Sequence, residues 1–171
     1  SSLHTVNLPD GLIEIYRYAF EKCTSLVYID IPDTVTTISS SAFLNCTALS
    51  SIGYPAGWTT VLDDYGNGTS HSYLYSPFQG CTSLTDLAIA DSVTTIGTSA
   101  FSHCYGLTSI TLPDSITVIG ANAFYGCRGI TNATISNEGN IGTSAFEGAM
   151  TSANGTLNVT NKGDIYNRAF Y

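Results

Sequence analysis

A sequence pattern with a period of 23 residues recurs along the chain and constrains its fold more than any other feature. The segment CTSLVYIDIPDTVTTISSSAFLNC (residues 23–46) returns as CTSLTDLAIADSVTTIGTSAFSHC (81–104) and as CYGLTSITLPDSITVIGANAFYGC (104–127). The remaining interval, from Cys46 to Cys81, is 35 residues, so that unit carries 12 extra residues. A period of this length is typical of units that stack side by side, because one unit cannot bury its apolar side alone.

We divide the chain into seven units on this period. Each opens with apolar residues in the order L-x-x-I-x-L, as at Leu26, Ile29 and Ile31, which predicts a short strand. Such strands should pair in parallel along the stack. We expect a single domain over residues 1–171, part of a longer array because no polar cap precedes Leu3. The units are 1–23, 24–46, 47–81 with the insertion, 82–104, 105–127, 128–149 and 150–171.

The rest of each unit predicts how the chain returns to the next strand. Pro32-Asp33 should turn the chain, since proline fixes φ and removes a donor from the strand ladder. Val35 and Ile38 then insert a second apolar pair from the opposite side, and Gly97 or Gly120 permits a bend. Small residues lead into Ala-Phe, where Ser or Thr is expected to cap a single helical turn. The phenylalanines should form an aromatic row in the core. They include Phe43, Phe101 and Phe124.

The composite pattern L-x-x-I-x-L-P-D-S-V-T-x-I-G-x-x-A-F-x-x-C resembles the BspA-like, or Treponema-type, leucine-rich repeat. The resemblance is strong over residues 1–127 and weak over 128–171. Together with the pattern, it predicts an α/β repeat solenoid with one parallel sheet face, and with short second strands and single helical turns on the other side. It implies a surface or secreted protein of a bacterium or parasitic protist, with a role in adhesion and in binding host proteins.

Residues 128–149 and 150–171 depart from the repeat. They lack the cysteine, and SNEGN and TNKGD replace P-D-S-V-T. The two segments resemble each other in ISNEGNIGTSAF and VTNKGDIYNRAF. Two interpretations are open: a variant type of repeat, or a degenerate edge that serves as a cap.

The charge balance excludes some classes of partner. Only 11% of the 171 residues are charged, and the formal net charge is −8. A nucleic-acid-binding protein needs a basic patch against the phosphates, and the five basic residues do not cluster along the sequence. No apolar run approaches the ~18 residues of a transmembrane helix. We therefore predict no nucleic-acid partner and no direct membrane insertion of this segment.

Five cysteines occupy one position of the repeat. Positions in register stack, so we expect a ladder of buried free thiols, which behave as small apolar groups. Neighbouring Cα atoms about 4.8 Å apart lie within disulfide range, so a disulfide is a second possibility, although side chains that point the same way disfavour it. No Cys-x-x-Cys or Cys/His spacing favours a metal. The ladder comprises Cys23, Cys46, Cys81, Cys104 and Cys127.

The residues between the apolar strand positions predict a sheet face that is small, polar and nearly uncharged. Solenoids of this kind often bind partners on the broad sheet face. Tyr28, Asp30 and Asp86 are its only strong features, and they are our candidate binding residues there. The competing interpretation is a solvated face that binds nothing, because it lacks the Trp, Tyr and Arg cluster typical of a binding hot spot.

The insertion lies in residues 62–76, which replace three residues of the repeat. Three hypotheses compete for it. Asp63 to Gly68 resembles half of a calcium loop, but Leu74 stands where a bidentate carboxylate is needed. Its tyrosines favour a binding loop, since tyrosine provides a large amphipathic contact area. The Gly-Asn-Gly sequence at 66–68 is typical of a hairpin turn and favours a decorative hairpin. The candidate binding residues are Trp58, Asp63, Asp64, Tyr65, His71, Tyr73 and Tyr75.

The sequence contains no recognisable catalytic motif. It has no G-x-S-x-G elbow, no phosphate-binding lysine loop and no nucleophile paired with a base, and we interpret His4 and His103 as surface or edge histidines. We predict a non-enzymatic module, without cofactor or metal, that recognises an extracellular protein or glycan outside the cell or at its surface. The alternative is a structural spacer or targeting module attached to a larger enzyme or envelope protein.

Overall fold

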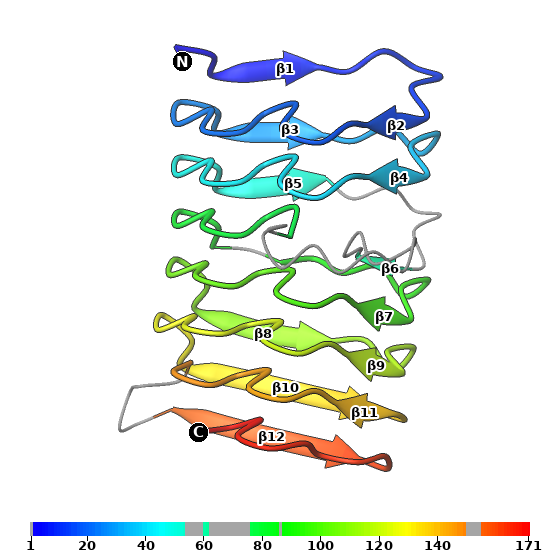
Figure 1. Cartoon of the computed structure of the whole chain (residues 1–171), viewed down its shortest axis with the longest axis vertical. Helices are drawn as coiled ribbons and strands as arrows, with labels where there is room; N and C mark the ends of the chain where they lie inside the picture. The colour runs from blue at the N-terminus through cyan, green and yellow to red at the C-terminus, as the bar shows by residue number, and fades with distance from the viewer. Residues whose placement is uncertain (1, 54–59, 62–75, 86, 150–154) are drawn as a thin grey trace.

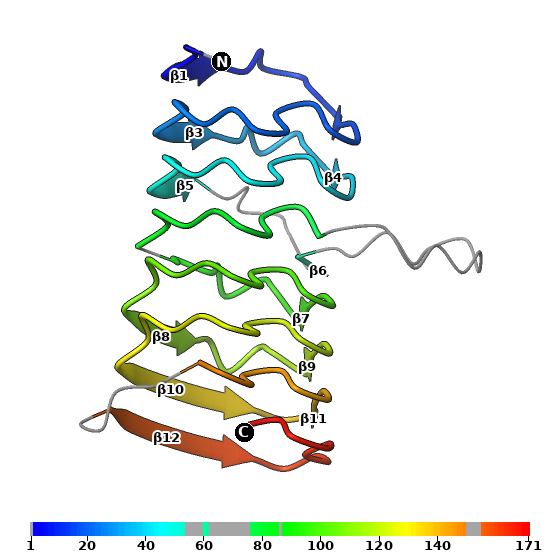
Figure 2. The same ribbon diagram turned by 60° about the vertical axis from the view of Figure 1, so that its left-hand side comes forward.

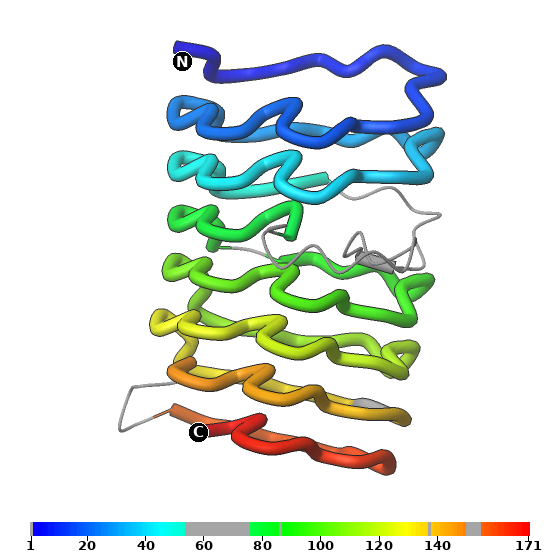
Figure 3. The backbone as a smooth tube through the Cα atoms, viewed as in Figure 1, coloured from blue at the N-terminus to red at the C-terminus, as the bar shows by residue number. Residues whose placement is uncertain are grey.

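The computed structural model of the chain describes residues 2–53, 60–61, 76–85, 87–149 and 155–171. The chain winds into a stack of coils with its two termini at opposite ends (Figures 1 and 3). Short strands lie in two columns along the stack, and every strand pair in each column is parallel. The architecture is therefore a parallel β-solenoid; the stack and its parallel strand pairing were predicted from the repeat.

The first column forms the broad sheet face. Its apolar positions stack in register, since Val6 pairs with Ile29 and Ile29 pairs with Ile52. Further along, Ile110 pairs with Ala133 in the same way. Identical register keeps the apolar side chains on the inner face and the polar ones outside. The strands are β1 (Thr5–Asn7), β3 (Tyr28–Asp30), β5 (Ser51–Gly53), β8 (Ser109–Leu112), β10 (Asn132–Asn137) and β12 (Thr156–Asn161).

The second column consists of two-residue strands on the other side of each coil (Figure 2). Their isoleucines point inward, and Ile38, Ile96 and Ile119 are buried. The second apolar pair therefore enters from the opposite side, as predicted. These strands are β2 (Glu14–Ile15), β4 (Thr37–Ile38), β6 (Thr60–Val61), β7 (Thr95–Ile96), β9 (Val118–Ile119) and β11 (Asn140–Ile141).

Between the columns the chain turns at the Pro-Asp positions. The N–H of Val35 donates to the carbonyl oxygen of Pro32 at 2.9 Å, and that of Ile116 donates to Pro113 at 3.1 Å. Both bonds span three residues, as in a β-turn with proline near its start. The predicted turn is confirmed.

Gly120 does not adopt a φ in the positive range. A Cβ at this position would lie 2.6 Å from the backbone nitrogen of Thr98 and 2.7 Å from the carbonyl carbon of Gly97. Gly142 stands in the same relation to Gly120 on the next coil, with 2.6 Å to its carbonyl carbon. Glycine is needed here because successive coils approach too closely for any side chain.

The single helical turns expected before each cysteine are wrong, and the described residues contain no helix. In the loop of residues 39–46, the N–H of Ala42 donates to the carbonyl oxygen of Ser39, three residues back, at 3.2 Å. The next N–H, that of Phe43, instead crosses to Pro77 on the following coil at 2.9 Å. Ser41 has a φ of 60°, in the left-handed region that a right-handed helix excludes. Residues with a φ near 60° recur in this loop in successive coils and divide it into consecutive tight turns. The fold is therefore a β-solenoid rather than α/β.

The predicted aromatic row is confirmed along the core. Neighbouring rings are stacked, with centroids 5.0–5.8 Å apart and interplanar angles of 6–15°. The five inner rings are buried, whereas the rings at the two ends of the row are partly buried. Each ring covers the one before it, so the row supplies continuous apolar contact along the stack. Its members are Phe20, Phe43, Phe78, Phe101, Phe124, Phe146 and Phe170.

Hydroxyl groups bond neighbouring coils to one another. The Thr117 hydroxyl donates to the carbonyl oxygen of Thr94 at 3.1 Å, and Thr131 donates to Thr108 at 3.2 Å. In both cases the backbone N–H of the same residue donates to the same oxygen. A carbonyl oxygen has two lone pairs and can accept both bonds. Part of the serine and threonine content therefore serves the stack itself.

The last two coils have longer strands than the coils before them, which fits a variant type of repeat. Strands β10 and β12 are six residues long and pair in register over their whole length. They extend further than β3 or β5 because no proline ends them. Beyond the strands, Lys162 forms an ion pair with Glu138 at 2.7 Å.

Candidate functional site

Two polar side chains on strand β3 form the strongest feature of the sheet face. Tyr28 and Asp30 flank the buried Ile29, and both are exposed. Side chains two positions apart in a strand lie on the same face, so the strand carries phenol and carboxylate together to the outside. Of the surface of Tyr28, 44% is exposed to solvent.

The two side chains lie close enough to interact electrostatically. The carboxylate of Asp30 and the hydroxyl of Tyr28 both approach the same point above Gly53 of the next strand. Desolvation and the negative charge of Asp30 both raise the pKa of the Tyr28 phenol. The phenol therefore remains protonated as a donor at neutral pH, and the pair holds one net negative charge.

Gly53 on the next strand makes room for this pair. It is the register partner of Asp30. A Cβ at position 53 would collide with Oδ1 of Asp30 and would lie 3.3 Å from the hydroxyl oxygen of Tyr28. Both polar groups thus converge on the space above one glycine. On the other side, Asn7 of β1 pairs with Asp30 and is exposed. We call Asn7, Tyr28, Asp30 and Gly53 the β3 site.

The β3 site stands out against a neutral background. Within the described strands of the first column, Asp30 is the only charged residue. The other outward positions there carry threonine, serine, asparagine or glycine. Members of this neutral set are Thr5, Ser51, Ser109, Thr111, Asn132, Thr134, Thr156 and Asn158.

Several predicted binding residues lie outside the described residues. Asp86 of the sheet face is one of them. The others are Trp58, Asp63, Asp64, Tyr65, His71, Tyr73 and Tyr75, which belong to the insertion and its approach. The hypotheses of a calcium loop, a binding loop and a hairpin in residues 62–76 therefore stay predictions.

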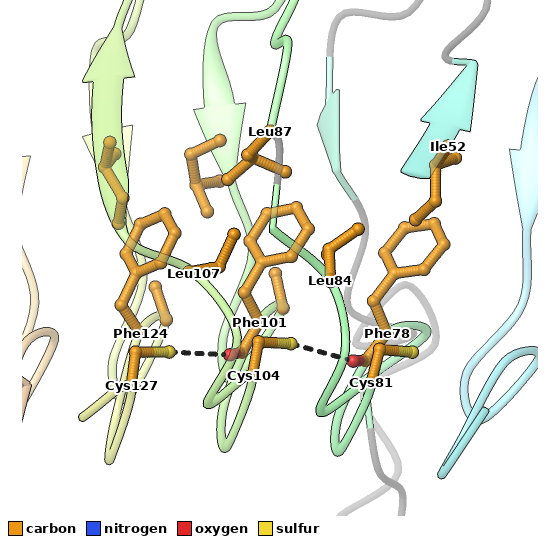
Figure 4. Packing of buried hydrophobic residues seen from close by; sticks show 14 of the residues in the cluster. Ile52, Phe78, Cys81, Leu84, Leu87, Phe101, Cys104, Leu107, Phe124 and Cys127 are labelled. Carbon is orange, nitrogen blue, oxygen red and sulfur yellow. Dashed lines mark hydrogen bonds between the residues drawn. The ribbon is translucent and has the colours of Figure 1, made fainter. Parts of the chain in front are cut away.

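The five cysteines are free thiols in one row. Cys46, Cys81, Cys104 and Cys127 are buried, whereas Cys23 at the first coil is partly exposed. Each buried thiol donates to a phenylalanine carbonyl oxygen on the preceding coil, as at Cys104 and Cys127 in Figure 4. The distances lie between 2.9 and 3.3 Å.

Burial also sets the protonation state of these thiols. It raises the pKa of Cys46 and of Cys127 to about 12, and it raises that of Cys81 and Cys104 as well. A thiol must ionise to act as a nucleophile or metal ligand. The buried row therefore fits a structural role and offers no reactive centre.

An aromatic cluster around His103 was missed by the sequence reasoning. The His103 ring meets Tyr125 edge-on at 5.4 Å, and Nδ1 lies 3.3 Å from the hydroxyl of Tyr105. His103 has a φ of 61° at a position that glycine occupies in the two neighbouring coils, as Gly80 and Gly126. This departure from glycine was the available signal. His103 lies at the edge of the stack and is partly exposed, and His4 is exposed, so both histidines lie where they were expected.

Two classes of site are absent from the described part of the chain. No group of three or more His, Cys, Asp or Glu side chains gathers there in a way that could hold a metal ion. Nor does any described segment form a helix with the length and apolar character needed to cross a membrane.

Comparison with known proteins agrees with this geometry. A sequence profile described as the BspA type leucine rich repeat region matches in six copies over residues 1–77 and 72–171. The crystal structure of the T. pallidum leucine rich repeat protein TpLRR has a TM-score of 0.77 at 28% identity, and the match covers 96% of this chain and 74% of that one. None of the curated proteins compared with the chain matches it.

Two further solved structures are similar but much longer. A leucine-rich repeat protein from Bacteroides ovatus has a TM-score of 0.68 at 26% identity, with 84% of this chain and 38% of that one covered. A leucine rich cell surface protein from Faecalibacterium prausnitzii has a TM-score of 0.51 at 24% identity, with coverages of 94% and 31%. The second likeness shows the fold alone, and the chain spans about a third of each of these two proteins.

Proposed function

This chain belongs to the BspA-type leucine-rich repeat family, and from that premise we propose that it is a non-catalytic binding module. In this proposal it recognises an extracellular protein or glycan and contributes to adhesion at the cell surface or in secreted form. One similar solved structure is that of a bacterial cell surface protein. At 24% identity that likeness shows the fold alone, so the location follows from the family resemblance only, and the binding role rests on the β3 site.

The observation that carries the proposal is the convergence of Tyr28 and Asp30 above Gly53. The pair stands on a parallel sheet whose register places both residues on the outer face beside Gly53. A rigid scaffold lowers the entropy lost when a partner binds. Tyrosine supplies contact area with few rotatable bonds, and the carboxylate supplies a directional acceptor. A protein side chain or a sugar hydroxyl can use both groups.

A binding screen tests the proposal directly. The intact chain would be immobilised and exposed to extracellular-matrix proteins and to a glycan array. We expect at least one ligand whose binding weakens when Tyr28 is changed to Ala, while the matched change Tyr105→Ala, at a similarly exposed tyrosine outside the strands, leaves it intact. A screen with no ligand would refute the binding role of this segment.

A second candidate function is a structural spacer, and one observation favours it. Many hydroxyl groups bond one coil to the next rather than facing solvent alone, as at Ser115, which donates to Val93 at 2.6 Å. This arrangement stiffens the stack without requiring a ligand. If deletion of residues 62–76 and Tyr28→Ala both leave cell attachment by the full-length protein unchanged, the spacer is the better description.

A further inference from the structure

We propose that the β3 site binds the guanidinium group of an arginine side chain presented by a partner protein. This inference rests on the proposed binding function and names the chemistry that the site recognises. The partner is accordingly a basic extracellular protein surface rather than a neutral glycan.

The charge distribution is the first reason. Asp30 is the only charged residue in the described strands of the first column, and no described basic residue lies in any of them to neutralise it. Its neighbour on the same strand face is the neutral phenol of Tyr28, which interacts with the Asp30 charge. A net charge of −8 over the chain also attracts a basic partner over longer distances. Among ligand groups, a cation complements this arrangement best.

The pairing of a carboxylate with an aromatic ring is the second reason. The guanidinium group is planar, bonds a carboxylate through two parallel N–H groups, and stacks on aromatic rings. Tyr28 and Asp30 lie on one strand face and offer both surfaces to a single group. The amide oxygen of Asn7, beside Asp30 in register, is a further acceptor. Gly53 adds no side chain of its own above the pair.

The test uses the intact chain and a flexible glycine-serine peptide that carries one arginine. The control peptide carries citrulline, which has the same shape and no charge. Binding is followed by amide chemical shifts in NMR titrations. We expect the arginine peptide, but not the citrulline peptide, to shift Tyr28, Asp30 and Gly53, and Asp30→Asn to weaken its affinity about fivefold.

Two further variants separate the site from general electrostatics. Asp114→Asn removes the same charge from an exposed turn and should leave the affinity unchanged within error. Gly53→Ala keeps the net charge but displaces the Asp30 carboxylate, because the new Cβ would collide with it. We expect Gly53→Ala to weaken binding about as much as Asp30→Asn does.

The outcomes distinguish this inference from the function on which it rests. Equal binding of the citrulline peptide, equal weakening by Asp114→Asn, or no weakening by either Asp30→Asn or Gly53→Ala overturns the arginine site. If the screen nevertheless finds a ligand that depends on Tyr28, the binding module stands and only its chemistry is wrong. If the screen finds nothing, the binding module itself fails.

Discussion

The thiol of Cys127 donates a hydrogen bond to the carbonyl oxygen of Phe101, one coil back, across 3.1 Å. The same oxygen accepts the backbone N–H of Cys104 at 3.2 Å. The bond recurs at Cys104, whose thiol donates to Phe78 (Figure 4). The cysteine row and the phenylalanine row are therefore one structural unit, in which each thiol fills the second acceptor site of a buried carbonyl.

Alkylation should distinguish the first cysteine from the rest. Cys23 is partly exposed, whereas Cys46 and the three thiols after it are buried. We expect iodoacetamide at neutral pH to modify Cys23 in the folded protein and to spare the other four. Peptide mass spectrometry locates the label, and denaturation in urea is the control that should expose all five. Rapid labelling of Cys104 in the folded protein would contradict the buried row.

The free energy of unfolding should fall at alkaline pH. Burial raises the pKa of Cys46 and Cys127 from 9.0 to about 12. Above pH 9.0 the unfolded chain releases protons that the folded chain retains, so stability is lost as the pH rises from there towards 12. Below that range both states keep the thiol protons, and these groups cause no change. Urea midpoints at about pH 8 and about pH 10.5 measure the effect. The Cys127→Ala variant should show a smaller fall, and an identical fall would assign it to other groups.

A ring at the centre of the aromatic row should contribute more to the free energy of unfolding than a ring at its end. Phe101 is fully buried between two stacked rings, whereas Phe170 has one ring neighbour and is partly buried. We expect Phe101→Ala to lower the free energy of unfolding by about 3–5 kcal/mol, and Phe170→Ala by about 1–2 kcal/mol. Urea unfolding followed by circular dichroism measures both. Equal losses would mean that the row does not act through burial.

Two glycines test the tight turns that replaced the expected helix. Gly126 and Gly148 have φ of 69° and 65°, so alanine is strained at both. A Cβ at 126 would also lie 2.8 Å from Nδ1 of His103, whereas at 148 its nearest neighbour is 3.8 Å away. We expect Gly126→Ala to destabilise by about 2 kcal/mol and Gly148→Ala by about 1 kcal/mol. Thermal unfolding measures the two losses. A second change, His103→Ala, should remove the difference between them.

Much of the fold followed from the repeat because a periodic sequence repeats its contacts. Phe43 and Phe101 occupy the same position in their units. When the units stack in register, their rings therefore lie in one row. The same reasoning placed the cysteines in one row and Ile38 on the inner side. The turn before each cysteine was mispredicted because propensity alone suggested a helix. In the observed turn, backbone hydrogen bonds within one coil alternate with hydrogen bonds to the neighbouring coil, and Ser41 has a φ of 60°. This pattern depends on the neighbouring coil, which local propensity does not include.

The sequence by itself determined the parallel stack, the register of its strands and the two rows of its core, since each follows from a spacing that recurs. Only the tertiary structure decided how residues that differ from unit to unit, such as Tyr28, Asp30 and Gly53, lie relative to one another. Gly53 is an ordinary outward position in its own unit, and Asp30 and Tyr28 belong to the unit before it. These three residues come together only because strands β3 and β5 pair in register. Gly53 has no Cβ, and the space above it is occupied by the side chains of Tyr28 and Asp30 from the neighbouring coil.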